Sequence, residues 1–132
     1  MLLAEDHDDS RQIYSLILRH YGYEVFEAVT GVQAVELARA GCPALILMDI
    51  GLPLLDGWEA SKLIKADPLT RRVPIIAFSA RVDSTADLGG AQPVFDGFIQ
   101  KPVSPLQLVS RVAAYLELLG GAAGFEIGRA HV

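Results

Sequence analysis

Residues 44–48, "ALILM", form a continuously apolar run that stops on a single carboxylate, Asp49. A strand that is hydrophobic on both alternating faces suits a sheet covered on both sides, and such sheets are usually parallel with crossover helices. In parallel sheets of this kind, ligands gather at the carboxyl ends of the strands. Asp49 is therefore either a functional group at such an end or a turn residue, because Asp also forms local hydrogen bonds in turns.

Apolar runs alternate with helical patterns along most of the chain. Strands are expected at 1–4, 24–28, 44–49, 73–79 and within 94–100, and helices after the "EDHDDS" segment at 5–10, at 30–40, at 58–65 and from 104 to about 119. A further helix at 84–90 is expected to be short or irregular, because "GG" at 89–90 and Pro93 disfavour a long one. This alternation predicts an α/β fold, a five-stranded parallel sheet that is doubly wound, with helices on both faces.

Several short motifs mark the helix ends. "TGVQ" at 30–33 and "SPLQ" at 104–107 match the capping box, in the second case with proline at the first helical position. Gly41 is expected to close the second helix, and the Asp67–Pro68 pair to end the third. Negative charge favours a helix start, so Asp8 and Asp9 are predicted to cap the first helix.

Composition narrows the possible functions. The 132 residues suit one domain, and 11 basic against 16 acidic residues give a net charge of −5, which argues against direct binding of nucleic acid. No apolar stretch approaches the roughly 20 residues of a membrane span, so no membrane contact and a cytoplasmic location are expected. The single cysteine, Cys42, is predicted to be a small half-buried hydrophobe. Residues 120–132 are predicted to be a flexible tail, either a linker stub or an adventitious extension.

Polar residues follow the predicted strands at the point where each one ends. Glu5 and Asp6 follow the first, Asp49 the third, Ser79 the fourth and Lys101 the fifth. Because the carboxyl ends of parallel strands share one edge of a sheet, we expect these side chains to meet. Three carboxylates repel one another unless a cation neutralises them, and oxygen ligands suit Mg²⁺. A lysine and a hydroxyl beside them suit a phosphoryl group.

Four segments, "LLAEDHDDS", "LMDIGLPLLDG", "PIIAFSA" and "FIQKP", resemble the signature segments of the receiver domain of two-component response regulators. The resemblance covers residues 1 to about 119 and implies a CheY-like, flavodoxin-like sheet with strand order 2-1-3-4-5. It implies that Asp49 accepts a phosphoryl group from a histidine kinase or a histidine phosphotransfer protein. It also implies a site for Mg²⁺ or Mn²⁺ made by Glu5, Asp6, Asp49 and the backbone carbonyl of Gly51.

The same resemblance assigns roles further along the chain. Ser79 and Lys101 would bind the phosphoryl oxygens, Ser79 and Phe98 would form the conformational switch, and the bond before Pro102 would be cis. Phe98 departs from the tyrosine that the family often carries, so no hydroxyl changes partner in the switch. The fourth helix, fifth strand and fifth helix would form the face for an output partner or a homodimer.

These features predict a signalling phosphoacceptor that is not an enzyme. Particular residues argue against two other functions. A phosphotransferase of the haloacid dehalogenase type normally has a second Asp two residues after the nucleophile, where this chain has Gly51. A calcium-binding loop at "DHDDSRQIYSLI" would need a central Gly and a terminal Glu, and the segment has neither. His7 is not expected to be a metal ligand, because hard cations prefer oxygen. The receiver could also have been excised from a hybrid histidine kinase or a longer regulator.

Overall fold

The computed structural model describes residues 1–80 and 94–119. The helix predicted at 84–90 and the tail predicted at 120–132 lie outside the described residues. Within the described part, no helix is long and apolar enough to cross a membrane.

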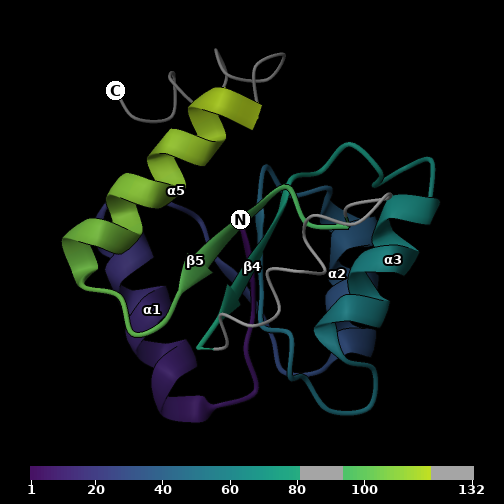
Figure 1. Ribbon diagram of the computed structural model, residues 1–132, viewed down its shortest axis with the longest axis horizontal. Helices are drawn as coiled ribbons and strands as arrows, with labels where there is room; N and C mark the ends of the chain where they lie inside the picture. The colour runs from purple at the N-terminus through teal and green to yellow at the C-terminus, as the bar shows by residue number, and fades with distance from the viewer. Residues whose placement is uncertain (81–93, 120–132) are drawn as a thin grey trace.

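The described strands form one parallel sheet (Figure 1). They are β1 (Leu2–Ala4), β2 (Phe26–Ala28), β3 (Ile46–Met48), β4 (Ile75–Ser79) and β5 (Gly97–Gln100). Their order is β2-β1-β3-β4-β5, and each neighbouring pair is parallel. The predicted fold class and strand order are confirmed.

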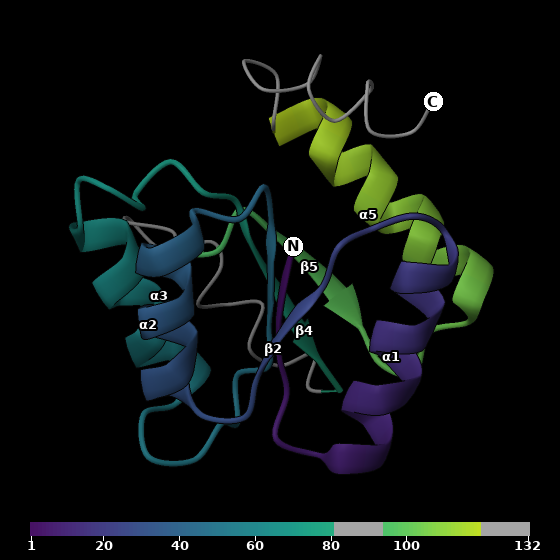
Figure 2. The ribbon, with the colours of Figure 1, turned by 180° about the vertical axis from the view of Figure 1, so that it is seen from behind.

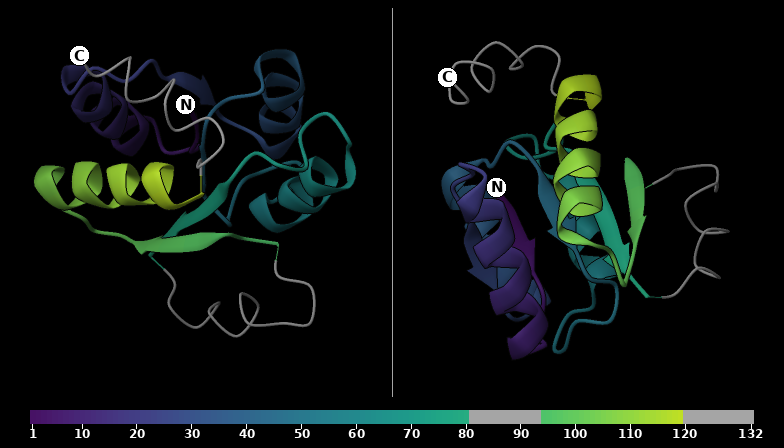
Figure 3. Two further views of the ribbon diagram at one scale, coloured as in Figure 1. Left: turned by 90° about the horizontal axis from the view of Figure 1, so that it is seen from above. Right: turned by 90° about the vertical axis from the view of Figure 1, so that its left-hand side faces the viewer.

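Helices cover both faces of this sheet. They are α1 (Asp8–His20), α2 (Gly31–Gly41), α3 (Gly57–Ala66) and α5 (Pro105–Leu119). Figure 2 and Figure 3 show α2 and α3 side by side on one face, with α1 and α5 on the other. A sheet enclosed in this way explains why its central strands are apolar on both sides.

The core consists of two apolar layers, one on each face of the sheet. Alternate strand residues divide between them, so that Ile46 and Met48 of β3 face α2 and α3, whereas Leu47 faces α1 and α5. On the helices, the first layer is completed by Ala34, Ala38, Ala60 and Ile64, and the second by Leu18, Leu108, Val112 and Leu116. Trp58, at the start of α3, packs against the first layer, and its ring centroid lies 5.6 Å from that of Phe95.

The capping signals are present at both predicted helix starts. Ser104 Oγ accepts a hydrogen bond from Gln107 N at 3.2 Å, and Gln107 Oε1 accepts one from Ser104 N at 3.3 Å, which is the complete reciprocal box. At α2, Thr30 Oγ1 accepts from Gln33 N at 3.0 Å, but Gln33 Oε1 accepts from the N–H of Val29 instead of Thr30. At α2, the glutamine side chain therefore bonds to the N–H of the residue before the N-cap, instead of to the N-cap itself.

Three local predictions were wrong. Gly41 does not close α2; the helix includes it, and Cys42 takes the left-handed conformation with φ 40°. Cys42 is consequently carried out of the core and is exposed, with Sγ 3.6 Å from Leu69 O. The N-cap of α1 is His7, without a side-chain bond, while Asp8 and Asp9 lie inside the first turn, where their charge still meets the positive end of the helix dipole.

Candidate functional site

The register of β1 and β3 brings two acidic residues together. Ala4 pairs with Met48, and the N–H of Asp49 donates to Ala4 O at 3.0 Å, so Glu5 and Asp49 leave adjacent strands at the same level. One carboxylate oxygen from each of Glu5, Asp6 and Asp49 lies within 4.8 Å of the other two. Glu5 is buried, Asp49 half-buried and Asp6 exposed, which gives a cluster that opens to solvent on one side.

The donor set of this cluster fits a hard divalent cation. Its three side chains offer oxygen atoms, the ligands that Mg²⁺ and Mn²⁺ prefer. His7 is exposed and does not belong to the group. Three carboxylates this close together carry a mutual repulsion that a bound cation would offset.

Lys101 supplies the positive charge at the cluster. Its Nζ donates to Glu5 Oε1 and lies 3.6 Å from Asp49 Oδ2. The backbone holds it there, because the N–H of Lys101 donates to Ser79 O at 2.9 Å. The ammonium also lies 5.1 Å from the centroid of the buried Phe78 ring, with which it makes a cation–π contact.

Glu5 is the most deeply buried acid of the cluster. Its side chain is 1% exposed, and this burial raises the pKa of its carboxyl above the usual value, against the opposing hydrogen bond from Lys101; the nearby charge of Asp49 raises the pKa further. The N–H of His7 donates to Glu5 Oε2 at 3.2 Å. In the metal-free protein, burial therefore makes the ionised form of Glu5 less favourable than it is in water.

A short loop holds Asp49 from the other side. The N–H of Gly51 donates to Asp49 Oδ1 at 3.0 Å, and the N–H of Gly57 donates to Ile50 O at 2.9 Å. A Cβ on Gly57 would lie 2.0 Å from Asp49 O, so α3 begins directly against the backbone of the cluster.

Ser79 and Phe98 lie on the neighbouring strands. Ser79 is the buried last residue of β4. Phe98 pairs in register with Ala77, and its half-buried ring packs in the layer under α2 and α3. The Lys101–Pro102 peptide bond is cis.

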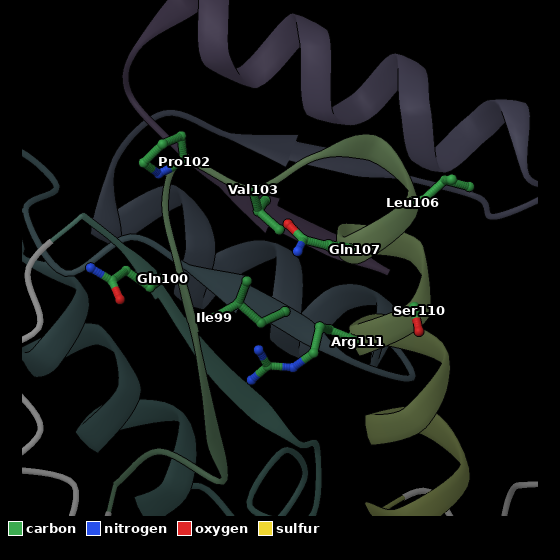
Figure 4. Close-up of a pocket in the computed structure, with 8 residues that line it drawn as sticks. All are labelled: Ile99, Gln100, Pro102, Val103, Leu106, Gln107, Ser110 and Arg111. Atoms are coloured by element: carbon green, nitrogen blue, oxygen red, sulfur yellow. The ribbon is translucent and has the colours of Figure 1, made fainter.

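A hollow of about 450 Å³ lies between β5 and α5 (Figure 4). Its lining comes from the end of β5 and the segment after it, and from the first turns of α5: Ile99, Gln100, Pro102, Val103, Leu106, Gln107, Ser110 and Arg111. None of the three clustered acids lines it, so it is separate from the cluster.

Comparison with known proteins places these features in context. The family model described as "Response regulator receiver domain" matches residues 1–113. The Polar-differentiation response regulator DivK of Brucella ovis is 31% identical over 116 residues, which cover 88% of this chain and 94% of DivK.

Solved receiver domains from other proteins have the same fold, as two examples illustrate. The receiver domain of a sensor histidine kinase from Pseudomonas aeruginosa PAO1, which has a magnesium ion coordinated in its active site cleft, aligns with a TM-score of 0.79 at 32% identity over 88% of this chain and 95% of that one. The signal receiver domain of a signal transduction histidine kinase from Syntrophus aciditrophicus aligns with a TM-score of 0.76 at 27% identity over 88% of both chains.

Proposed function

The chain belongs to the response regulator receiver domain family of two-component signalling, and we propose that it is a phosphoacceptor whose Asp49 takes a phosphoryl group from a histidine kinase or a histidine phosphotransfer protein. The observation that carries this proposal is the position of Asp49. Its carboxylate stands at the end of a central buried strand, within 4.8 Å of two other acids and 3.6 Å from a lysine ammonium.

The proposed chemistry is a nucleophilic displacement. A carboxylate oxygen of Asp49 forms a bond to phosphorus while the P–N bond of the donor phosphohistidine breaks, and the imidazole nitrogen keeps the electron pair. The product is an acyl phosphate on Asp49. Lys101 provides a fixed positive charge for the phosphoryl oxygens, and the hydroxyl of Ser79 is proposed as their second partner.

Glu5, Asp6, Asp49 and the Gly51 carbonyl would hold Mg²⁺ or Mn²⁺. A bound divalent ion would supply charge neutralisation for the acids and the incoming phosphoryl oxygens. The oxygen-rich cluster supports this assignment, as does the magnesium in the related cleft from Pseudomonas aeruginosa. Within the chain, Lys101 would exchange part of its contact with Glu5 for the phosphoryl group.

The response to phosphorylation is proposed to pass through Ser79 and Phe98 to the face formed by the helix predicted at 84–90, β5 and α5. That face would bind an output partner or a second copy of the chain.

A net charge of −5 opposes direct contact with nucleic acid. The signalling unit is proposed to be residues 1–119 with 120–132 as a tail, acting in the cytoplasm either alone or as the receiver of a hybrid kinase or longer regulator.

Intact mass spectrometry after incubation with acetyl phosphate and Mg²⁺ tests the proposal. The parent should gain one phosphoryl group and Asp49→Asn none, while Asp9→Asn, which alters an exposed acid outside the cluster, should be labelled like the parent. Labelling of Asp49→Asn at the parent's level would overturn the assignment. Continuous release of phosphate from p-nitrophenyl phosphate would favour the haloacid dehalogenase alternative.

A further inference from the structure

Phe78 is a buried aromatic residue beside the positive charge of the candidate site. It lies on β4, one residue before Ser79, and its side chain is fully buried in the layer under α1 and α5. The Nζ atom of Lys101 lies over its ring, 5.1 Å from the centroid, and the lysine side chain is only 16% exposed. An ammonium this close to a ring is attracted by the negative face of the ring, and more strongly where water is excluded.

The Phe78 ring is held firmly in place. Tyr14 of α1 packs against it, with ring centroids 4.8 Å apart and an angle of 68° between the planes, which is the T-shaped arrangement that aromatic pairs favour. On the sheet, Phe78 pairs in register with Ile99 of β5. Lysine, by contrast, carries its charge on a flexible four-carbon stem, so a fixed ring limits where the ammonium can lie.

The other two contacts of the ammonium are with groups that the proposed chemistry also uses. Nζ donates to Glu5 Oε1 and lies 3.6 Å from Asp49 Oδ2. The carboxylates of both residues are proposed ligands of a divalent cation, and Asp49 is the proposed nucleophile. The attraction of the two acids for Lys101 therefore weakens when the site is in use. An aromatic ring is not a ligand for a hard cation, so the contact with Phe78 persists.

We propose that Phe78 is a positioning residue: its ring holds the Lys101 ammonium beside Asp49 for the incoming phosphoryl oxygens. This proposal rests on the proposed function, since it concerns the same lysine. Phe78 does not touch the transferred group. It acts through the position of Lys101 alone.

A matched pair of substitutions tests the proposal. Phe78→Leu keeps an apolar side chain in the core but removes the ring, and Phe95→Leu makes the same change at a buried residue of the layer on the opposite face of the sheet. The rate of Asp49 labelling by acetyl phosphate at saturating Mg²⁺ is measured by intact mass. Phe78→Leu should lower this rate by about fivefold, the rate equivalent of a partly buried cation–π contact, whereas Phe95→Leu should keep the parent's rate.

A double-mutant cycle separates a positioning role from a structural one. Lys101→Met removes the ammonium and should slow labelling. If Phe78 acts through Lys101, adding Phe78→Leu to Lys101→Met should slow labelling no further. If the ring only supports the fold, the fivefold loss should appear in both backgrounds.

Proton NMR of the parent observes the contact directly and does not depend on any variant folding. The chain has three lysines, and protons held over an aromatic ring resonate upfield. The ε-methylene protons of Lys101 should therefore lie upfield of those of Lys65, which lies over no ring in the described part of the chain. Lys62, whose Nζ lies 5.3 Å from the centroid of the Trp58 ring, is the positive reference.

The outcomes distinguish the two proposals. Labelling of Phe78→Leu at the parent's rate, an equal loss in Phe95→Leu, or a further loss in the double variant overturns the positioning role and leaves the phosphoacceptor standing. Unshifted Lys101 protons in the parent do the same. A parent that is not labelled overturns the phosphoacceptor and the positioning role together.

Discussion

The hydroxyl of Tyr115 accepts a hydrogen bond from the backbone N–H of Phe98 at 3.1 Å and donates to its carbonyl oxygen at 3.3 Å. Arg111 Nη2 donates to the same carbonyl at 2.6 Å. β5 is an edge strand of the described sheet, and edge strands leave backbone groups without a strand partner. Gly97 makes the approach possible, because a Cβ there would lie 2.4 Å from the Tyr115 ring. Two side chains of α5 thus close the sheet edge at the proposed switch residue.

Tyr115→Phe should lower the free energy of unfolding by about 1 kcal/mol, because the N–H of Phe98 loses its acceptor. Hydrogen exchange at Phe98 should accelerate, while the bond from Arg111 to the carbonyl remains. Tyr21→Phe removes a hydroxyl from a residue that is 44% exposed and should change neither quantity. Unaltered exchange at Phe98 in Tyr115→Phe would show that this bond does not protect the strand edge.

Glu5→Gln should stabilise the metal-free protein at neutral pH and abolish its stabilisation by Mg²⁺. The pKa of Glu5 is raised in the folded state, chiefly by burial, so the stability it contributes is complete below the unfolded pKa of about 4.5 and is lost as pH rises through the folded pKa. The melting temperature of Glu5→Gln, relative to the parent, should therefore increase as pH rises from about 4.5 through the folded pKa of Glu5, and should level off above it. A difference that is constant with pH would contradict the assignment.

Gly57→Ala should destabilise the fold by about 1–3 kcal/mol, the usual cost of forcing an extra group into a packed site. The new Cβ would lie 2.0 Å from Asp49 O, so the backbone of the phosphoacceptor has to move. Gly41→Ala is the control, because a Cβ there meets no atom within 4 Å and alanine favours the helix. Urea unfolding measures both; equal stability of the two variants would refute the contact.

Ser61→Ala should increase stability, since Ser61 Oγ is buried in α3 with no hydrogen-bond partner in the described part of the chain. Removing an unsatisfied hydroxyl is expected to gain about 1 kcal/mol. Ser110→Ala, at an exposed site in α5, measures the gain from helix propensity alone, about 0.5 kcal/mol. A gain no larger than that of Ser110→Ala would mean that Ser61 carries no desolvation penalty.

Patterns of side-chain type and spacing were sufficient to predict the parallel sheet and the acidic cluster. The run ending at Asp49 is apolar throughout because β3 is covered on both faces, and this signal requires no knowledge of the partner strands. Once the strands are parallel, the meeting of Glu5 with Asp49 follows from topology. Strand ends were less predictable: Leu45 is buried yet lies outside β3, because burial extends beyond the hydrogen-bonded ladder.

Backbone contacts were the part that sequence could not predict. Whether Gly41 or Cys42 takes the left-handed position depends on one further turn-closing hydrogen bond, from Cys42 N to Ala38 O at 2.9 Å. The proximity of Gly31 to Leu55, and of Gly57 to Asp49, depends on how helices dock on a loop. Tyr115 reaches Phe98 from another element, and neither residue carries a local signal for that bond.

The loop at 50–56 has a fixed length. Surface loops ordinarily accept insertions and deletions at little thermodynamic cost. Here the Ile50 carbonyl accepts a hydrogen bond from Gly57, Leu52 is buried, and the Pro53 carbonyl accepts one from Gly31 at the start of α2. An added residue would therefore have to displace a helix. Related chains should therefore differ at exposed positions such as Leu54 by substitution, while keeping the same number of residues between Asp49 and Gly57.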